Sequence, residues 1–460
     1  MKHKITLLLI VSFLVAAGSV IYLYDVLTTS NSEDMVEIFT SPYITEFSIP
    51  TKSSVPNGIG VDRNGNVWFA EIEGDKLAML DKNSYLITEY NIPDGVGEVW
   101  SLDFDSNGNI WFADKNDRIW NFDTADKSFK KYDVPTKGSM PTDLVIDADG
   151  KIWIAQLRNN YSEEGDRIAV FDPEKEVFTQ YKLADKSGPI GLALDNENIW
   201  ITQTYAHSIG KFNRYDFSYK QFEPSKGMVS PIGIAVDDKG TVWFAQHGAS
   251  KVSSFGESNQ TLFEFTTSPG LFPITTPYWI LIDSKQNIWF NEHSTNKIAR
   301  FIKENNTLIE YKIPSEREEL VNVLTIALDQ NDNLWFTEWS RNRIGVVNAY
   351  MPLPFTMDVS SDFVATTAGK NVELELTLMS RSNVIREIYF NASSTMTLTG
   401  EFVNSTIRFE PSSIKLGNSN EKIRVVLGTE TKLEPDVYSV TVSASDEFIT
   451  YARIITLEVL

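Results

Sequence analysis

The sequence predicts an all-β protein in which a seven-bladed β-propeller is followed by an immunoglobulin-like β-sandwich, with an N-terminal transmembrane or signal segment. Three observations support this fold class: seven tryptophan-centred repeats, a C-terminal region of alternating strands that lacks the repeat, and an uncharged apolar run near the N-terminus. The predicted parts are a signal anchor or signal peptide at 1–25, a polar stalk at 26–42, the propeller at 43–350 and the sandwich at 355–460.

Each repeat contains an apolar run that ends in Asp, a polar turn, and a second apolar run around a Trp, as in GIGVDRNGNVWFAE and GIAVDDKGTVWFAQ. A period in the forties, made of short strands separated by turns, is typical of a propeller with one four-stranded blade per repeat. The repeat tryptophans are therefore predicted to be core residues. They lie 42 to 47 residues apart, at Trp68, Trp111, Trp153, Trp200, Trp243, Trp289 and Trp335.

Within one repeat the pattern resolves into four strands, which in the fifth copy read PIGIAVD, TVWFAQ, SKVSSF and TLFEFTT. Six copies of the fourth strand lie between repeats. The seventh copy, YITEFSIP at 43–50, lies upstream of the first repeat, and no similar strand follows the last one. The N-terminal strand is therefore predicted to close the ring as the outer strand of the seventh blade.

The recurring segments P-x-G-I, W-F-x-E, N-K-I-A-R and x-x-E-Y-x-I-P resemble the streptogramin B lyase (virginiamycin B lyase) family of seven-bladed propellers, over residues 43–348. This resemblance implies a Mg²⁺-assisted elimination that opens a cyclic depsipeptide. It also implies a histidine base at the x of P-x-G in the last blade, a second histidine one blade earlier, and glutamate ligands for the metal.

The residues at these positions depart from the family pattern. Leu324 and Tyr278 occupy the two histidine positions, and Asn322 occupies one acidic ligand position, whereas Glu338 matches a glutamate ligand. Leucine neither accepts nor donates a proton, so the family's mechanism is not expected here unless another base replaces the histidine.

A polar residue stands three places after each repeat tryptophan, and these residues are predicted to surround one mouth of the central channel. Four carboxylates would then form one arc that faces three glutamines. Such an arc favours Mg²⁺ or Ca²⁺, and no organic cofactor is predicted. In the alternative, the side chains bind backbone N–H groups at the strand ends and hold no metal. The predicted metal ligands are Glu338, Glu292, Glu71 and Asp114, and the glutamines are Gln246, Gln203 and Gln156.

Histidines and aromatic residues at the same mouth give a second prediction. His293 follows Glu292 and is the candidate general base, and His247 holds the corresponding place one blade earlier. Rings beside amides and carboxylates suit a sugar or peptide ligand, whereas the alternative is that they pack between blades. The predicted ligand-binding residues are Tyr278, Trp279, Trp100, Trp339 and His247, together with the three glutamines.

The N-terminal run from Ile5 to Tyr24 follows two lysines and is long enough to span a bilayer as a helix. The lysines place the N-terminus in the cytoplasm and the remainder outside. A cleaved signal peptide with a small-residue site at 16–18 is the alternative. Export agrees with five Asn-x-Ser/Thr sequons, at Asn160, Asn259, Asn305, Asn391 and Asn404, which suggest a glycoprotein.

Composition excludes some functions. A net charge of −21 argues against nucleic acid as a partner, and the absence of cysteine excludes disulfides and thiol chemistry. A monomer is expected. Two functions remain: a membrane-tethered extracytoplasmic protein that binds a small molecule, carbohydrate or peptide at the channel mouth, with the sandwich as spacer, or a divalent-cation-dependent C–O lyase or lactone hydrolase with a rearranged catalytic centre.

Overall fold

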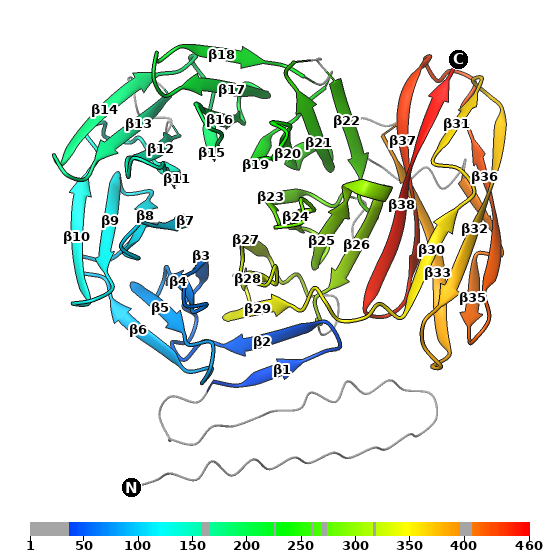
Figure 1. Cartoon of the computed structure of the whole chain (residues 1–460), viewed down its shortest axis with the longest axis horizontal. Helices are drawn as coiled ribbons and strands as arrows, with labels where there is room; N and C mark the ends of the chain where they lie inside the picture. The colour runs from blue at the N-terminus through cyan, green and yellow to red at the C-terminus, as the bar shows by residue number, and fades with distance from the viewer. Residues whose placement is uncertain are drawn as a thin grey trace, which may run out of the picture.

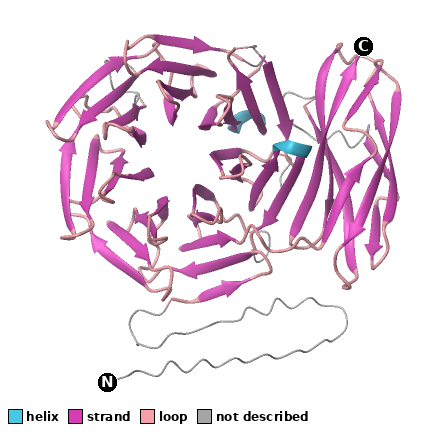
Figure 2. Cartoon of the chain, viewed as in Figure 1, coloured by secondary structure: helices cyan, strands magenta, loops and turns pink. Residues whose placement is uncertain are grey.

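The computed structural model describes residues 36–157, 166–224, 227–258, 261–268, 274–315, 319–395 and 407–460. Sheets in this part of the chain are arranged around a common centre, and a second β unit lies against one side of the ring (Figure 1). Strands dominate, and the helices are the short 3-10 segments η1 (His247–Ala249) and η2 (Lys303–Asn305) (Figure 2). None of the described helices has the length and apolar character needed to cross a bilayer. The predicted membrane or signal segment at 1–25 lies outside the described residues.

Four-stranded sheets follow one another along the chain, and together they form a propeller. The first three consist of β3 (Pro56–Val61), β4 (Val67–Glu71), β5 (Lys76–Leu80) and β6 (Ile87–Asn91); β7 (Val99–Phe104), β8 (Ile110–Asp114), β9 (Arg118–Asp123) and β10 (Ser128–Asp133); and β11 (Pro141–Ile146), β12 (Ile152–Gln156), β13 (Arg167–Asp172) and β14 (Val177–Lys182).

The next three sheets repeat this order. They consist of β15 (Pro189–Leu194), β16 (Asn198–Gln203), β17 (Ser208–Asn213) and β18 (Tyr219–Phe222); β19 (Pro231–Val236), β20 (Val242–Gln246), β21 (Lys251–Gly256) and β22 (Thr261–Thr266); and β23 (Pro277–Ile282), β24 (Ile288–Glu292), β25 (Lys297–Ile302) and β26 (Thr307–Lys312).

Both ends of the ring contribute to the seventh sheet. Its inner strands are β27 (Val323–Leu328), β28 (Leu334–Glu338) and β29 (Arg343–Val347), and its outer strands are β2 (Ile44–Ser48) and β1 (Ile38–Thr40). The closing strand β2 pairs antiparallel with β29, from Ile44 opposite Val347 to Ser48 opposite Arg343. Phe47 of β2 is buried and stacks on Trp335, with ring centroids 5.8 Å apart. Below, the four strands of a blade are called A to D from the centre outwards, and the blades are numbered from β3.

A hydrogen bond between Asp and Trp explains the repeated sequence. In every blade the Asp after strand A accepts a hydrogen bond from Nε1 of the strand B tryptophan, over 2.8–3.4 Å. Its other oxygen accepts backbone N–H groups of the turn between the strands, as Asp62 does from Asn64 and Asn66. Each indole then packs in an apolar cluster between two blades; Trp68, for example, packs with Phe112 of the next blade. The prediction that these tryptophans are core residues is confirmed.

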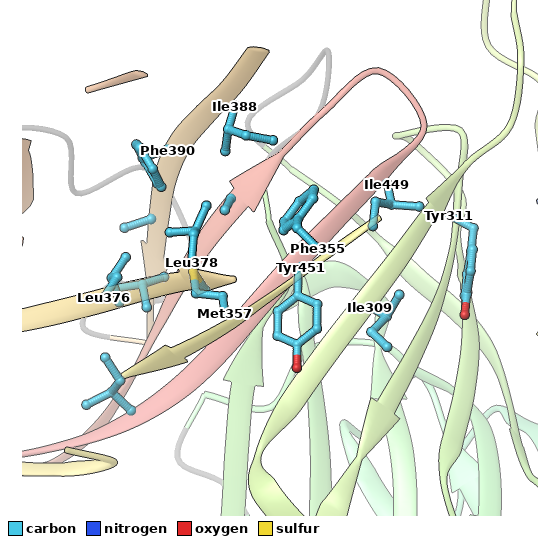
Figure 3. Close-up of a cluster of buried hydrophobic side chains, with 14 of the residues drawn as sticks. Ile309, Tyr311, Phe355, Met357, Leu376, Leu378, Ile388, Phe390, Ile449 and Tyr451 are labelled. Atoms are coloured by element: carbon cyan, nitrogen blue, oxygen red, sulfur yellow. The ribbon is translucent and has the colours of Figure 1, made fainter. Parts of the chain in front are cut away.

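The C-terminal region forms two sheets. One contains β30 (Phe355–Val359), β32 (Asn371–Ser380), β36 (Glu421–Gly428) and β34 (Ile407–Glu410), and the other contains β38 (Ile449–Val459), β37 (Asp436–Ser445), β33 (Arg386–Ser394) and β35 (Ser413–Leu416), with β31 (Phe363–Thr366) parallel to β38. Apolar side chains from both sheets share one buried cluster, in which Phe355, Met357, Leu376, Leu378, Ile388 and Phe390 are labelled in Figure 3. Its immunoglobulin-like topology stays a prediction.

One strand joins the C-terminal unit to the propeller. β38 pairs antiparallel with β26, the outer strand of blade 6, so that one continuous sheet runs from the propeller into the C-terminal region (Figure 1). Ile309 and Tyr311 of β26 belong to the same apolar cluster as Ile449 and Tyr451 of β38 (Figure 3). The C-terminal unit is therefore fixed to blade 6 by both backbone pairing and a shared core.

Candidate functional site

Strand A begins and strand B ends at the same end of each blade, because the two strands are antiparallel neighbours. Pro277 at the start of β23 lies opposite Glu292 at the end of β24, and Val323 lies opposite Glu338 in the next blade. This end of the propeller, called the mouth below, carries the candidate residues that the sequence analysis selected.

The polar residues at the ends of the B strands are fully buried within their own blades. In blade 6, Glu292 lies opposite Lys297 of strand C, and Lys297 bridges it to Glu310 of strand D, with Nζ–Oε2 separations of 3.9 and 3.1 Å. In blade 7, Oε2 of Glu338 lies 3.4 Å from the guanidinium of Arg341. In blade 6 the strand B residue thus belongs to a polar row that crosses strands B, C and D.

The same row recurs in the other blades. Glu71 lies beside Lys76 and Glu89 in blade 1, and these last two form an ion pair. The three glutamines bind partners in their own blades: Gln156 accepts from Gln180, Gln203 donates to Tyr219, and Gln246 donates to Ser253 and Glu264. In blade 2, Asp114 pairs with Arg118 at 2.7 Å and accepts from Nε1 of Trp120.

Small residues on strand C make these rows possible. Ala78, Ala299 and Gly345 stand opposite the strand D acids, so the longer side chains from strands B and D can meet over them. A Cβ on Gly210 would lie 3.3 Å from the amide carbon of Gln203. The rows therefore depend on residues of strands B, C and D.

The structure does not bring Glu338, Glu292, Glu71 and Asp114 together as one cation site. Each belongs to the row of a different blade, and the described residues contain no group of three His, Asp or Glu side chains that could hold a metal ion. The outcome is nearer to the structural alternative: Asp114 accepts the backbone N–H of Asn116, and the three glutamates lie beside charged side chains of their own blades. The recurring Lys or Arg at the start of strand C and the Glu or Gln in strand D are the sequence signals that point to the rows.

Burial raises the pKa values of all three strand B glutamates, including Glu338. Burial, and then the charge of Glu89, raise the pKa of Glu71 to about 8. Burial, and then the charge of Glu310, raise the pKa of Glu292 to about 8 against the opposing effect of Lys297. Both carboxyls are therefore largely protonated at neutral pH.

The raised pKa values predict that stability falls as the pH rises. An unfolded glutamate has a pKa near 4.5, so the stabilising effect of the protonated carboxyls is complete below this value and is lost as the pH passes about 8. We expect the double substitution Glu71→Gln and Glu292→Gln to flatten the decline between pH 5 and 9, because glutamine already fills this place in three blades. At pH 9 the double variant should exceed the parent by roughly 1–3 kcal/mol in thermal or urea unfolding.

The control for this prediction is Glu304→Gln, which neutralises an exposed glutamate and should leave the pH profile unchanged. A double variant whose stability is lowered equally at every pH would contradict the assignment, because it would show that the glutamates are needed for their shape rather than held protonated.

At the centre of the mouth, the rings form one contact group. Tyr278, at the start of strand A in blade 6, contacts His247 and His293, with ring centroids 5.4 Å apart in both pairs. The two histidine rings lie 5.8 Å apart, and Trp100 lies 6.2 Å from Tyr278 on the other side. All four residues are half-buried. These four rings are called the mouth cluster below.

Apolar side chains from other blades support the mouth cluster. Leu157, Ile190 and Ile232 are buried there, and Trp100, Met140, Tyr278 and Trp279 pack against them. Trp100 and Trp279 also line a channel of about 400 Å³ that is formed by the A strands. The structure thus brings together four of the predicted ligand-binding residues, Trp100, Tyr278, Trp279 and His247, with the candidate base His293.

Other predicted ligand residues lie apart from the mouth cluster. Trp339 follows the last B strand and is 42% exposed, and no contact joins it to the cluster among the described residues. The three glutamines are buried in their blades. An ion pair that was not predicted from the sequence joins Glu98 and Lys115 at 2.6 Å. Glu98 accepts a hydrogen bond from Nε1 of Trp100, and Nζ of Lys115 lies 3.9 Å from the centroid of the same ring.

Burial changes the proton affinity of the central rings. It lowers the pKa of His247 to about 4, with a further contribution from His293, and it lowers the pKa of His293. Burial, and then the charge of Glu98, raise the pKa of Tyr278 well above its usual range. At neutral pH the cluster therefore contains two neutral imidazoles and a neutral phenol, with the Glu98–Lys115 ion pair at its edge.

The model of the virginiamycin B lyase family matches residues 13–163 and 178–352. The chain belongs to the virginiamycin B lyase family. Among solved structures, it resembles a streptogramin B lyase at 26% identity and a TM-score of 0.59, covering 66% of this chain and 97% of that one. No curated protein matches the chain.

Two further structures of the virginiamycin B lyase from Staphylococcus aureus share the fold. A selenomethionine form is 23% identical, with a TM-score of 0.58, and covers 66% of this chain and 98% of that chain. A catalytically inactive histidine-to-alanine variant with quinupristin is 24% identical, with the same TM-score and coverage.

The residues at the family's metal and histidine positions fit Mg²⁺ chemistry poorly in this member of the virginiamycin B lyase family. Glu338 is fully buried, and the guanidinium of Arg341 lies 3.4 Å from one of its oxygens, so a positive charge already stands beside the carboxylate. Leu324 and Tyr278 offer no imidazole at the two histidine positions.

Proposed function

We propose that this protein is a lyase-family propeller that binds a small ligand, a sugar or a peptide at the mouth without the lyase chemistry of its family. The observation that carries the proposal is the replacement of both family histidines, with Tyr278 at the centre of a half-buried ring cluster in one of those positions. Tyrosine and tryptophan rings supply contact area and hydrogen-bonding edges, which suit binding. We further propose that the apolar run at 5–24 tethers the protein outside the cytoplasm.

The ion pair at the edge of the mouth cluster suggests how a ligand would be oriented. Glu98 and Lys115 hold Trp100 from two sides, and the side chain of Glu98 remains 41% exposed. An apolar surface with a few fixed polar groups at its rim is the usual composition of a small-molecule site. A sugar hydroxyl or a peptide amide would bind Glu98 while the ring faces cover the apolar part of the ligand.

A thermal-shift screen of the purified full-length protein against sugars, short peptides and cyclic depsipeptides tests the proposal. We expect at least one of these compounds to raise the melting temperature of the protein. The protein should not convert this compound to a product, either with or without Mg²⁺. Tyr278→Ala should weaken its binding at least about tenfold, because a central aromatic contact is lost. The control is Tyr215→Ala, an exposed ring at the opposite end of a blade, which should bind normally.

A second function, a C–O lyase or lactone hydrolase with a rearranged catalytic centre, is favoured by the two imidazoles beside Tyr278. His293 would act as the base, since its neutral ring can accept a proton. Turnover of a cyclic depsipeptide or lactone that is abolished by His293→Ala would replace the binding proposal with this one. Turnover that depends on Mg²⁺ and is lost in Glu338→Gln would instead restore the family mechanism.

A further inference from the structure

His247 and His293 occupy equivalent places in adjacent blades. Each is the first residue after strand B, at the end of β20 and β24, and each donates its backbone N–H to the carbonyl of the residue before strand A, Ser230 and Thr276. The propeller repeat therefore places the two imidazoles side by side at the mouth. Their ring centroids lie 5.8 Å apart with the planes nearly perpendicular.

The ring nitrogens of both histidines lack hydrogen-bond partners among the residues that the structure describes. In contrast, the exposed His207 of blade 4 accepts a hydrogen bond at Nδ1 from the backbone of Ser230. The nitrogens of these two adjacent imidazoles are therefore not occupied by protein groups in the described part of the chain and can serve as ligands to a metal ion.

The distance between the two rings fits shared coordination of one metal ion. Imidazole nitrogens bind transition metals at about 2.0–2.1 Å, which places the centres of two rings on one ion about 5–6 Å apart. Tyr278 contacts both rings edge to face at 5.4 Å. Oxygen-rich sites suit Mg²⁺ and Ca²⁺, whereas neutral imidazoles suit Zn²⁺, Cu²⁺ and Ni²⁺.

We propose that His247 and His293 bind one transition-metal ion of the Zn²⁺, Cu²⁺ and Ni²⁺ class at the mouth, with the remaining coordination positions open to water or to a ligand. The site uses residues of blades 5 and 6 and differs from the positions that the resemblance assigns to Mg²⁺. It goes beyond the proposed function, since metal binding requires no organic ligand. An open site of this kind would give a bound sugar or peptide a direct metal contact.

Titration of the purified, untagged full-length protein with Cu²⁺ tests this site, using calorimetry together with paramagnetic resonance of the bound ion. All proteins carry His3→Ala, so that the N-terminal histidine cannot compete. We expect one Cu²⁺ per chain with two imidazole nitrogens in the spectrum. His247→Ala and His293→Ala should each weaken binding at least tenfold, whereas His207→Ala should leave it unchanged. Equal affinity in the His247→Ala/His293→Ala double variant would overturn the proposal.

A second measurement requires no substitution in the mouth cluster. Diethylpyrocarbonate modifies accessible imidazoles, and mass spectrometry reports each site. We expect Zn²⁺ to protect His247 and His293 at least fivefold and to leave the modification of His207 unchanged. Equal modification of all three residues with and without Zn²⁺ would also overturn the proposal, even if the alanine variants fail to fold. Neither experiment depends on an organic ligand, so a failed ligand screen would leave the metal result intact.

Discussion

Replacing Asp283 by alanine is expected to lower the free energy of unfolding by roughly 2–4 kcal/mol. One oxygen of Asp283 accepts the backbone N–H groups of Lys285 and Asn287, and the other accepts Nε1 of Trp289 at 3.0 Å. Trp289 has no exposed surface. The substitution leaves a buried indole N–H without its partner and frees the turn between strands A and B.

A double-mutant cycle separates these two effects. Trp289→Phe alone removes the donor and part of the core, and in its background Asp283→Ala should destabilise only through the turn. Asp238→Ala, at an exposed aspartate in the corresponding turn of blade 5, is the matched control and should change the melting temperature little. If Asp283→Ala changes the melting temperature as little as the control does, the Asp–Trp hydrogen bond does not explain why Asp and Trp recur in every repeat.

The repeat made the propeller predictable because its signal is local. Each Asp–Trp pair lies within six residues or fewer, so the interaction that holds the blade is visible as a short spacing. The upstream copy of strand D has the same sequence pattern as the other copies. The last sheet lacks a fourth strand unless this copy completes it, and the copy does so as β2, which pairs with β29. The central aromatic residues were also detectable, because Trp100 and Tyr278 stand where other blades have small or aliphatic residues.

Spacing located the strand ends but did not give the direction of their side chains. Successive residues of a strand point to opposite faces of the sheet, and in a propeller both faces meet neighbouring blades rather than the axis. Glu292 and Glu338 therefore lie over strands C and D instead of gathering around the channel. Residues near the start of the A strands and just after the B strands do reach the mouth, which is why Tyr278 and Trp100 meet the two histidines there.

The junction between the propeller and the C-terminal unit carried no signal in the sequence. It pairs residues 449–453 with residues 307–311, and both segments read as ordinary alternating strands. The sandwich was predicted from the sequence to be a spacer. The observed pairing makes β38 a fifth strand of blade 6, and the spacer role stays a prediction.

Ile454→Asp is expected to destabilise the propeller and the C-terminal unit together, by about 4 kcal/mol or more. Ile454 lies on β38 with 1% of its surface exposed, in an apolar cluster with Phe265 and Phe301 of blades 5 and 6. Its backbone N–H also binds the carbonyl of Asn306 beside β26. The aspartate would place an unpaired charge in this cluster and remove packing that the outer strands of two blades share with β38.

The matched control is Val437→Asp, which makes a similar change on the neighbouring strand β37 at a side chain that is 61% exposed. It should leave the melting temperature almost unchanged. Calorimetry of the parent protein should show one transition in which both units unfold, because the continuous sheet couples them, and Ile454→Asp should shift that transition or divide it. A variant in which only a separate C-terminal transition moves, while the propeller unfolds as in the parent, would show that β38 is attached to blade 6 without supporting it.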